Sequence, residues 1–318
     1  MEQFGVPTAS YKSFELSQTA DIESYLNAYP SYPVVLKADG LAAGKGVFIC
    51  ETRESALDAL AQFGAGSFGE AAGTLVIEEF MTGEEVSVFA ACDGDHTVIL
   101  AHAQDHKRIG DGDTGLNTGG MGAYSPAPVL DDAGLKTVEE TVVKPVVEGM
   151  KSLGHPYKGI LYCGLMMTPT GPKVVEFNCR FGDPECQVII PKMGSDLVEL
   201  MLLATEGRLN EYEYKANPGY FCCVVEASKG YPGSYTKGFP IYGLADVAEP
   251  AIVFHAGTKT GESGDEIVTS GGRVLGVVGT GESLEAAISS AYENVNKVSF
   301  DGAYFRKDIG HRGLRYFN

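Results

Sequence analysis

Short runs of β-branched residues alternate with helical patterns in the first part of the chain, and this alternation limits the fold more than any other sequence feature. Runs at 33–38 and 46–49 predict strands, and Thr52 is a suitable cap for a helix that presents apolar residues at helical spacing. Two further strands are predicted at 74–79 and 85–91. The pattern therefore predicts a small α/β subdomain followed by the start of a second one.

Residues 104–128 interrupt this pattern with six glycines and two prolines. An irregular connection of this length inside a compact domain is uncommon and is usually functional. After it, Asp131 or Asp132 can cap a helix that we expect to kink at Pro145 and to stop at Gly154. The sequence thus predicts a functional loop without regular structure, followed by a helix that packs on a sheet.

The rest of the chain divides into a hairpin, a helix and a strand-rich segment. Strands at 159–167 and 173–178 form the predicted hairpin, and Ser195 is the predicted cap of a helix that runs to Gly207. From about Gly219 the sequence becomes rich in strands, which indicates a separate C-terminal domain. The predicted domains span residues 1–86, 87–215 and 216–318.

The 318 residues include 24 Lys and Arg against 42 Asp and Glu, which gives a formal net charge of −18. Such a charge repels nucleic acids and anionic membrane surfaces, so neither is a predicted partner. A site for anionic phosphates must then be built locally, from a few cations beside backbone N–H groups. Seven cysteines without a CxxC pair, and the lack of a membrane span or signal peptide pattern, predict a cytoplasmic protein.

A glycine-rich segment, residues 37–47, joins two predicted strands and carries Lys37 and Lys45. It is not a Walker A loop, since Gly46 stands where Ser or Thr should follow the lysine. Its exposed N–H groups and flanking cations suit a mobile lid over a polyphosphate. A tight β-turn with two solvated lysines is the alternative interpretation.

Two acidic segments offer groups suited to a metal-bound nucleotide. In residues 76–87, adenine can lie against apolar side chains while Glu85 accepts hydrogen bonds from the ribose, although a solvated acidic hairpin is the alternative. Glu176 and Asn178 share one face of a predicted strand, and their oxygens suit Mg²⁺. Arg180 follows and can grip a phosphoryl oxygen, although a solvent-facing polar strand also explains this motif.

The glycine-rich region also contains groups suited to a small zwitterionic substrate. Residues 104–108 and 117–126 combine cations, an acid and glycines whose backbone groups can hold such a molecule. His106 is a candidate base, but a single histidine is more often structural. Cys222 and Cys223 are expected on opposite faces of one strand, which argues against joint metal binding.

Taken in chain order, the elements singled out above resemble the complete set of an ATP-grasp enzyme. They are Lys37, residues 40–46, residues 78–81, Glu85, Glu176 and Asn178. Four strings resemble, more narrowly, the family of phosphoribosylamine–glycine ligases, also called glycinamide ribonucleotide synthetases. These strings lie at residues 37–47, 117–128, 176–185 and 305–310, so the resemblance covers essentially the whole chain. It implies an α+β ATP-grasp fold, with two α/β subdomains sandwiching ATP, followed by a small strand-rich C-terminal domain.

The resemblance also implies a reaction. ATP phosphorylates the carboxylate of glycine, and the amine of 5-phosphoribosylamine attacks the resulting glycyl phosphate. The products are glycinamide ribonucleotide, ADP and phosphate, in a step of de novo purine biosynthesis. The implied co-substrate is ATP, and the implied cofactor is Mg²⁺ or Mn²⁺.

The resemblance further implies roles for individual residues. The implied catalytic residues are Arg180 and Lys107. The implied ATP-binding residues are Lys37, Gly44, Lys45, Gly46, Glu78, Glu79, Phe80, Met81 and Glu85. The implied metal ligands are Glu176 and Asn178, and the implied substrate-binding residues are Asp105, Gly120, Met121, Asp183, Pro184, Glu185 and Lys307.

The family normally begins with a further α/β domain that helps to hold phosphoribosylamine, and residues 1–8 align instead with the start of the ATP-binding region. We therefore expect a ligase chain of this family, either an incomplete one or one that works with a separately encoded N-terminal part. The alternative is a Mg-ATP-binding chain or subunit without catalysis of its own. A ligase with another acceptor is disfavoured by the string at 117–128. Arg306, Lys307 and Arg312 offer a contact for the substrate phosphate, or form a solvated basic tail.

Overall fold

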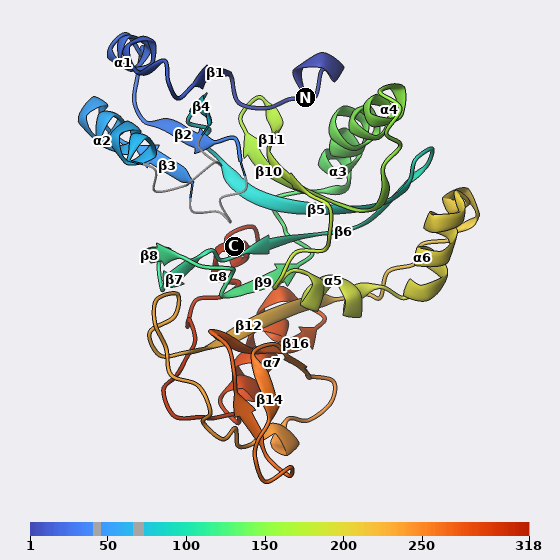
Figure 1. Ribbon diagram of the computed structural model, residues 1–318. Helices are drawn as coiled ribbons and strands as arrows, with labels where there is room; N and C mark the ends of the chain where they lie inside the picture. The colour runs from blue at the N-terminus through green and yellow to red at the C-terminus, as the bar shows by residue number, and fades with distance from the viewer. Residues whose placement is uncertain (41–45, 66–72, 318) are drawn as a thin grey trace. The chain divides into compact units, whose positions relative to one another are not determined.

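The computed structural model describes residues 1–40, 46–65 and 73–317. These residues form two compact units (Figure 1). The small unit comprises residues 7–83 and 168–173, and the large unit comprises residues 1–6, 84–167 and 174–318. Gly44 and Lys45, two of the predicted ATP-binding residues, lie outside the described residues.

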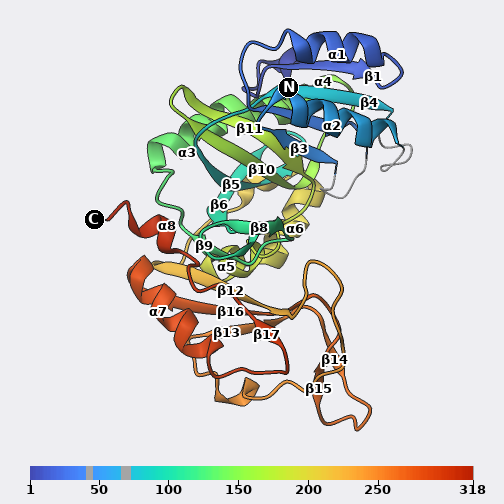
Figure 2. The ribbon, with the colours of Figure 1, turned by 90° about the vertical axis from the view of Figure 1, so that its left-hand side faces the viewer.

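The small unit is an antiparallel sheet packed against two helices (Figure 2). Its strands, in the order β1–β4–β2–β3, and its helices are β1 (Tyr11–Glu15), α1 (Thr19–Asn27), β2 (Val34–Ala38), β3 (Val47–Cys50), α2 (Arg53–Gly64) and β4 (Thr74–Glu79). Thr52 caps α2 as predicted, because its hydroxyl accepts the N–H of Ser55 and the Ser55 hydroxyl accepts the N–H of Thr52. Leu60 is buried in the core, where the predicted helical spacing places it.

The large unit is built on one long sheet, and the strands that the structure describes in it follow the order β11–β10–β5–β6–β9–β12–β16–β13. Neighbouring strands from β10 to β13 pair antiparallel, and β17 pairs with β12. The strands of this sheet are β5 (Glu84–Asp93), β6 (Thr97–Asp105), β9 (Gly122–Ser125), β10 (Lys158–Thr168), β11 (Gly171–Asn178), β12 (Tyr220–Ser228), β13 (Ile252–His255), β16 (Arg273–Gly281) and β17 (Ala303–Tyr304). The hairpin predicted at 159–178 is confirmed as β10 and β11.

Helices cover both faces of this sheet. The α-helices of the large unit are α3 (Asp132–Val138), α4 (Lys144–Ser152), α5 (Cys186–Lys192), α6 (Leu197–Glu206), α7 (Leu284–Val295) and α8 (His311–Leu314). Shorter helical turns are η1 (Glu2–Phe4), η3 (Glu139–Val143), η4 (Leu209–Glu211) and η5 (Leu244–Asp246). Val86 and Val88 of β5 share a core with α3 and α4, whereas Phe89 and Ala91 share a core with α5 and α6. Because side chains alternate along a strand, Glu85 and Ser87 belong to the row that faces α5.

The helix predicted after Asp131 forms and continues past Pro145 as three consecutive segments. Asp131 caps α3, since its carboxylate accepts the N–H of Gly134 at 2.7 Å. A π-helical turn, η3, joins α3 directly to α4, and Pro145 lies in the first turn of α4. A widened turn accommodates a proline that lacks an N–H and crowds the preceding turn, so the helix continues instead of breaking.

Two other sequence predictions are wrong in detail. Residues 104–128 are not structureless, because they contain the end of β6, the hairpin of β7 (Arg108–Gly110) and β8 (Thr114–Asn117), and β9. The glycines supply positive φ angles, as at Gly112 and Gly115, and not disorder. The cap of α6 is Asp196, whose carboxylate accepts the N–H of Glu199, whereas the Ser195 hydroxyl accepts the N–H of Lys215.

The strand-rich C-terminal segment continues the large unit. β12 pairs with β9, and β16 and β13 extend the sheet beyond it, while β14 (Thr258–Thr260) and β15 (Ile267–Thr269) form a separate hairpin. Cys222 and Cys223 of β12 lie in different cores on opposite faces of the sheet, as predicted. The division into three domains stays a prediction, since residues 216–318 fall in the same compact unit as β5 and β6.

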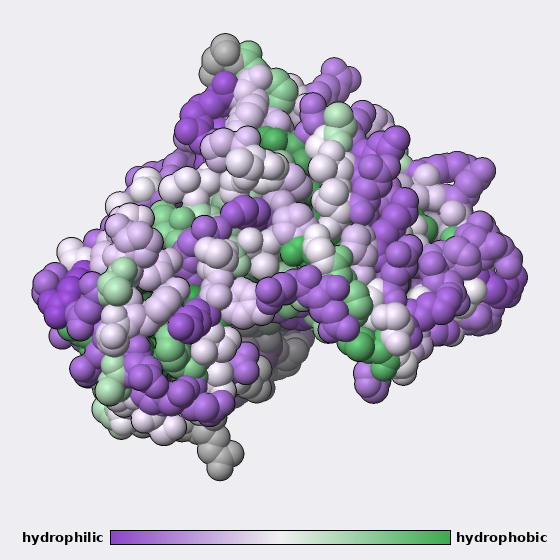
Figure 3. Space-filling view, turned by 90° about the horizontal axis from the view of Figure 1, so that it is seen from above, coloured by the Kyte–Doolittle hydropathy of each residue, from purple (hydrophilic) through white to green (hydrophobic). Residues whose placement is uncertain are grey.

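Hydrophilic residues dominate the face of the molecule seen in Figure 3, with hydrophobic residues in small groups between them. Such a distribution is ordinary for the exposed surface of a folded chain. Among the helices that the structure describes, none has the length and apolar character needed to cross a membrane.

Candidate functional site

Charged side chains gather where β5 begins and β6 ends. The carboxylate of Glu85 forms an ion pair with the ammonium group of Lys107, which follows β6. Burial alone would lower the pKa of Lys107, but the negative charges of Asp105 and Glu85 outweigh it and raise that pKa. Lys107 therefore keeps its positive charge at neutral pH.

The backbone at these two strand ends is fixed by side chains from other elements. The Gln104 amide donates a hydrogen bond of 2.8 Å to the carbonyl of Glu85, and the Tyr124 hydroxyl donates one of 2.6 Å to Gln104. Arg312, from α8, donates to the carbonyl of Asp105 at 2.6 Å. Glu85, Asp105 and Lys107 form what we call the charged row. The contacts above hold this row in place before any substrate arrives.

A buried carboxyl group, Glu185, lies beside this row. Its side chain is 4% exposed, and its Oε1 atom lies 3.3 Å from the hydroxyl of Ser87 on β5. That hydroxyl is also 2.8 Å from the hydroxyl of Tyr162 on β10. Burial, reinforced by the negative charge of Asp105 and opposed by Lys107, raises the pKa of Glu185 to about 7. Glu185 was predicted from the resemblance, whereas Ser87, two residues after Glu85 on the same face, was missed although its spacing gave a signal.

The predicted metal ligands lie on β11. Glu176 is exposed, and its negative charge is among those that raise the pKa of Lys107, so it belongs to the same face as the charged row. Phe177 packs against the core shared with α3 and α4, which places it on the face opposite Glu176 and Asn178. Arg180 is exposed, and its guanidinium donates a hydrogen bond of 2.8 Å to the carbonyl of Phe181.

These residues fit a divalent ion that is held partly by its substrate. Within the described residues, no group of three or more His, Cys, Asp or Glu is arranged to hold a metal ion. Mg²⁺ commonly takes only one or two carboxylates from the protein and completes its shell with substrate phosphates and water. A carboxylate and an amide oxygen at Glu176 and Asn178 suit that mode of binding.

In the small unit each predicted glutamate has its own lysine. Lys37 of β2 forms an ion pair of 2.6 Å with Glu78 of β4, and Lys173 forms one of 2.7 Å with Glu79. The hydrogen bond from Lys173 lowers the pKa of Glu79 more than burial raises it. Lys37, predicted to bind phosphates, thus lies beside a residue predicted to bind the nucleotide.

The other predicted nucleotide-binding residues of the small unit flank these pairs. Phe80 and Met81 follow β4 directly, with Phe80 exposed and Met81 half-buried. Gly46 is buried, and its carbonyl accepts the N–H of Ala38 at 2.9 Å, which closes the base of the hairpin between β2 and β3.

Three predicted substrate-binding residues meet around an arginine that sequence reasoning missed. Arg273 of β16 donates hydrogen bonds of 2.8 Å to the carbonyls of Gly119 and Asp183, and it pairs with the Asp183 carboxylate at 3.1 Å. Gly120 has a φ of +110°, and a Cβ atom there would overlap the ring of Pro184. Only glycine fits this approach. Nothing in the sequence around Arg273 points to this role.

Met121 and Lys307 make contacts of different kinds. Met121 is fully buried, its N–H donates to the carbonyl of His106 at 2.8 Å, and its carbonyl accepts the N–H of Val225 at 3.0 Å. Lys307 is exposed, and its backbone N–H donates to the carboxylate of Asp111 at 2.8 Å. The side chain of Met121 is thus part of the core, whereas that of Lys307 is open to solvent.

Arg306 is not part of a solvated basic tail, which corrects one of the sequence expectations. Its side chain is 0% exposed and donates two hydrogen bonds of 2.7 Å to Asp308 and one of 2.9 Å to Asp113. A fourth bond, of 2.9 Å, goes to the carbonyl of Arg108 at the start of β7. His106 is also buried, and its Nε2 atom accepts the N–H of Gly310 at 3.1 Å, as expected for a structural histidine.

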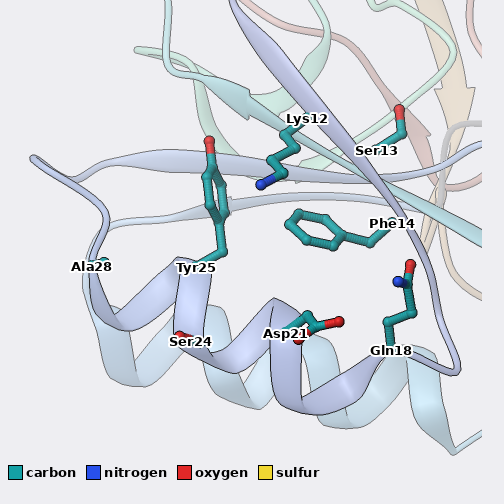
Figure 4. A pocket seen from close by; sticks show the side chains of 8 residues that line it. All are labelled: Lys12, Ser13, Phe14, Gln18, Asp21, Ser24, Tyr25 and Ala28. Carbon is teal, nitrogen blue, oxygen red and sulfur yellow. The ribbon is translucent and has the colours of Figure 1, made fainter.

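A surface hollow in the small unit lies between β1 and α1 (Figure 4). The ammonium group of Lys12 lies over the rings of Tyr25 and Phe14, at 5.0 and 5.1 Å from their centroids. This cation–π arrangement already satisfies the lysine. None of the predicted site residues lines the hollow, so it does not locate the candidate site.

Two family models match the sequence. The ATP-grasp (A) domain of phosphoribosylglycinamide synthetase matches residues 1–186, and the C domain of the same enzyme matches residues 221–312. A phosphoribosylamine–glycine ligase of Rhodopirellula baltica is 50% identical, and the match covers 97% of this chain and 72% of that protein. One from Synechocystis is 46% identical and covers 98% of this chain and 73% of the relative. The chain therefore spans about three quarters of the length of these relatives.

Solved structures give the same fold. A phosphoribosylamine–glycine ligase from Thermotoga maritima is 36% identical, with a TM-score of 0.82 over 97% of this chain and 76% of that chain. The biotin carboxylase domain of a Hydrogenobacter thermophilus 2-oxoglutarate carboxylase, solved with MgADP, is 18% identical with a TM-score of 0.74, and it covers 100% of this chain and 72% of that chain. At 18% identity the likeness shows the fold alone. The chain has the α+β ATP-grasp fold.

Proposed function

The chain belongs to the phosphoribosylglycinamide synthetase family, and on that premise we propose that it ligates glycine to 5-phosphoribosylamine with cleavage of ATP. The products are glycinamide ribonucleotide, ADP and phosphate, and the step belongs to de novo purine biosynthesis. The observation that carries the proposal is that the matched regions include both the ATP-grasp domain and the C domain of this enzyme. The strings specific to the family lie in both regions.

We propose that ATP is bound by the residues that the resemblance implies. The predicted phosphate ligands are Lys37 and Lys45 with the glycines at 44 and 46, and Glu78, Glu79, Phe80, Met81 and Glu85 serve the adenosine. The ion pairs of Glu78 with Lys37 and of Glu79 with Lys173 support this proposal, because they hold both carboxylates in fixed positions. Glu85, fixed by Lys107 and Gln104, is suited to accept hydrogen bonds from ribose hydroxyls.

We propose that Glu176 and Asn178 would hold the divalent ion, Mg²⁺ or Mn²⁺, that accompanies ATP. When bound, such an ion stabilises negative charge on the phosphoryl oxygens. Arg180 and Lys107 are the proposed catalytic residues, since both carry permanent positive charge that can stabilise the transferring phosphoryl group. Arg180 is exposed, and the hydrogen bond that it donates to the carbonyl of Phe181 leaves further N–H donors for a phosphate.

Glycine and phosphoribosylamine are the proposed ligands of the remaining predicted residues. Asp105, Asp183 and Glu185 offer carboxylates for amines, and Lys307 offers an ammonium group for a phosphate. Gly120 and Pro184 shape the backbone beside Asp183, while Met121 supports that loop from the core.

Seven free thiols among the described residues support a proposed location in the reducing cytoplasm.

The test is formation of glycinamide ribonucleotide from Mg-ATP, glycine and freshly generated phosphoribosylamine. Product that disappears in Glu176→Ala would support the proposed ligase and its metal site. Product that appears only after addition of the N-terminal part of a relative would support a separately encoded partner. Glu176-dependent ATP binding without product under either condition would contradict the proposal and favour a nucleotide-binding chain without catalysis.

A further inference from the structure

We infer that the carboxylate of Glu185 accepts the proton that the amine of 5-phosphoribosylamine loses as it attacks glycyl phosphate. This inference rests on the proposed function and assigns a chemical step to a residue for which the resemblance implies substrate binding alone. It is carried by the position of Glu185 among the described residues of the large unit.

The step requires a base for its atoms and charges to balance. The amine nitrogen donates its electron pair to the carbonyl carbon of glycyl phosphate, forming the C–N bond of the amide. The C–O bond to phosphorus-bound oxygen breaks, and phosphate leaves with that electron pair. The nitrogen, positively charged after the attack, releases one proton to the Glu185 carboxylate, which later passes it to water. No oxidant, reductant or further co-reactant is needed.

The position of Glu185 suits this role because its carboxylate borders the charged row of the large unit. Its Oε1 atom lies 3.3 Å from the hydroxyl of Ser87, in the same strand row as Glu85. A hydrogen bond from this hydroxyl orients a carboxylate and leaves its second oxygen for another partner. The side chain is 4% exposed, so water competes weakly for the proton.

Two neighbouring groups, Glu85 and Lys107, are worse proton acceptors. Glu85 is engaged in its ion pair with Lys107, and Lys107 is already protonated. Burial raises the pKa of Asp105 as well, against the opposing charges of Lys107 and Arg312, and the negative charge of Asp105 is the second cause of the raised pKa of Glu185.

Two further groups face Glu185, and both hold their protons. Burial, followed by the negative charges of Glu185 and Asp105, raises the pKa of Tyr162. Burial raises the pKa of Cys186, the first residue of α5, to about 11, with the charges of Asp183 and Glu185 adding to the effect. Neither group is therefore an acceptor near neutral pH.

The acid–base balance of Glu185 matches the operating pH of a cytoplasmic enzyme. With a pKa of about 7, both the carboxylate and the protonated form of Glu185 are populated near neutral pH. A general base works best when its pKa lies near the pH of the reaction, because it is then both available and strong enough to take the proton. An exposed glutamate, with its ordinary pKa of 4.5, would be a weaker base.

The experiment compares the pH dependence of kcat/KM for phosphoribosylamine in the wild type, Glu185→Gln and Glu185→Asp. We expect wild-type kcat/KM to rise with pH and level off near pH 7. In Glu185→Gln we expect kcat/KM at neutral pH to fall by about 100-fold or more, without that inflection, while the KM values for ATP and glycine stay within about threefold. Glu185→Asp should recover part of the activity and keep an inflection.

Glu226→Gln is the matched control. Glu226 is another fully buried carboxyl group of the large unit with a raised pKa, and burial is the only cause of that shift. The control variant should keep the wild-type profile. An unchanged profile in Glu185→Gln, or a uniform loss that preserves the inflection, would overturn the inference. Failure of the wild type to form product would instead contradict the proposed function.

Discussion

The two units treat their functional glutamates in opposite ways. In the small unit Glu78 and Glu79 each have a lysine of their own, Lys37 and Lys173, at 2.6 and 2.7 Å. In the large unit a single lysine, Lys107, acts on Glu85, Asp105 and Glu185. One unit balances its carboxylates pair by pair, and the other gathers an excess of negative charge.

The difference has a direct effect on protonation. A dedicated cation lowers the pKa of Glu79, so that carboxylate stays ionised and suits the fixed binding role proposed for it. Burial together with shared negative charge raises the pKa of Asp105 and raises that of Glu185 to about 7, so Glu185 can exchange a proton near neutral pH. Pairing thus suits binding, whereas crowding suits acid–base chemistry.

The largest effect on stability is expected at Glu226. Burial alone raises the pKa of this carboxyl group, so Glu226 shows the effect of burial without that of neighbouring charges. Both of its carboxylate oxygens are buried without a hydrogen-bond partner among the described residues, and burial raises its pKa from 4.5 to about 8. The folded chain therefore keeps this proton up to about pH 8, whereas the unfolded chain loses it near 4.5. The free energy of unfolding should fall by about 1.4 kcal/mol per pH unit between those values, and no further above them.

Glu226→Leu should remove this pH dependence and raise the free energy of unfolding increasingly from pH 5 to pH 8. Denaturant titrations of the wild type and Glu226→Leu across that range measure the difference between their free energies of unfolding. The titration of other groups is common to both proteins and cancels in this difference. Glu226→Gln is the control, because it removes the charge and keeps the shape. Parallel pH profiles of the wild type and Glu226→Leu would mean that the folded carboxyl finds a partner.

The second largest effect is expected for Lys107→Met, which removes the cation shared by the large-unit carboxylates. We expect kcat to fall by about 100- to 1,000-fold, since the proposed role of Lys107 is to stabilise the transferring phosphoryl group and a positioned charge contributes that much. Lys173→Met is the matched control, because it removes a lysine paired with a single glutamate. A loss below about tenfold, or an equal loss in both variants, would break the contrast between the units.

A smaller effect is expected for Asp105→Asn. The negative charge of Asp105 is the second cause, after burial, of the raised pKa of Glu185, so its removal should lower that pKa. The inflection in kcat/KM for phosphoribosylamine should then move to lower pH, whatever the change in the maximum rate. An inflection that stays in place would assign it to a group other than Glu185.

The smallest effect is expected for Lys173→Met on stability. A lowered folded pKa means that Glu79 stabilises the fold above its unfolded pKa and loses this contribution as pH falls through the folded value. The Glu79 side chain is 37% exposed, so solvent screening limits the contribution to about 0–1 kcal/mol. Thermal unfolding at pH 7 and pH 3 measures it. A loss of several kcal/mol in the free energy of unfolding at pH 7 would show that the ion pair of Lys173 and Glu79 stabilises the fold more than an exposed pair does.

Local patterns in the sequence predicted the elements that depend on local physics. The cap at Thr52, the cap at Asp131 and the hairpin of β10 and β11 follow from side chains that act within a few residues of their own backbone. The cap at Asp196 was misplaced by one residue, because Ser195 is an equally suitable cap by composition and its hydroxyl is used by Lys215 instead.

The candidate site was predicted only as far as motifs reach. Glu85, Glu176 and Lys107 were found from their strings, and the structure brings them to one face of the large-unit sheet. Ser87 had a signal in its spacing from Glu85. Arg273 had none, because it lies 90 positions from Asp183 and 154 positions from Gly119 in the sequence.

The sequence alone determined the family, the alternation of strands and helices, and which residue types stand in the motifs. The tertiary structure decided the burial, the charge and the protonation of these residues. The amino-acid sequence does not show that Glu185 and Glu226 are buried while Glu176 is exposed. It also does not show that the side chain of Arg306 donates hydrogen bonds to Asp308 and Asp113. Desolvation and Coulomb interactions depend on distances between residues far apart in the chain, and only the fold sets those distances.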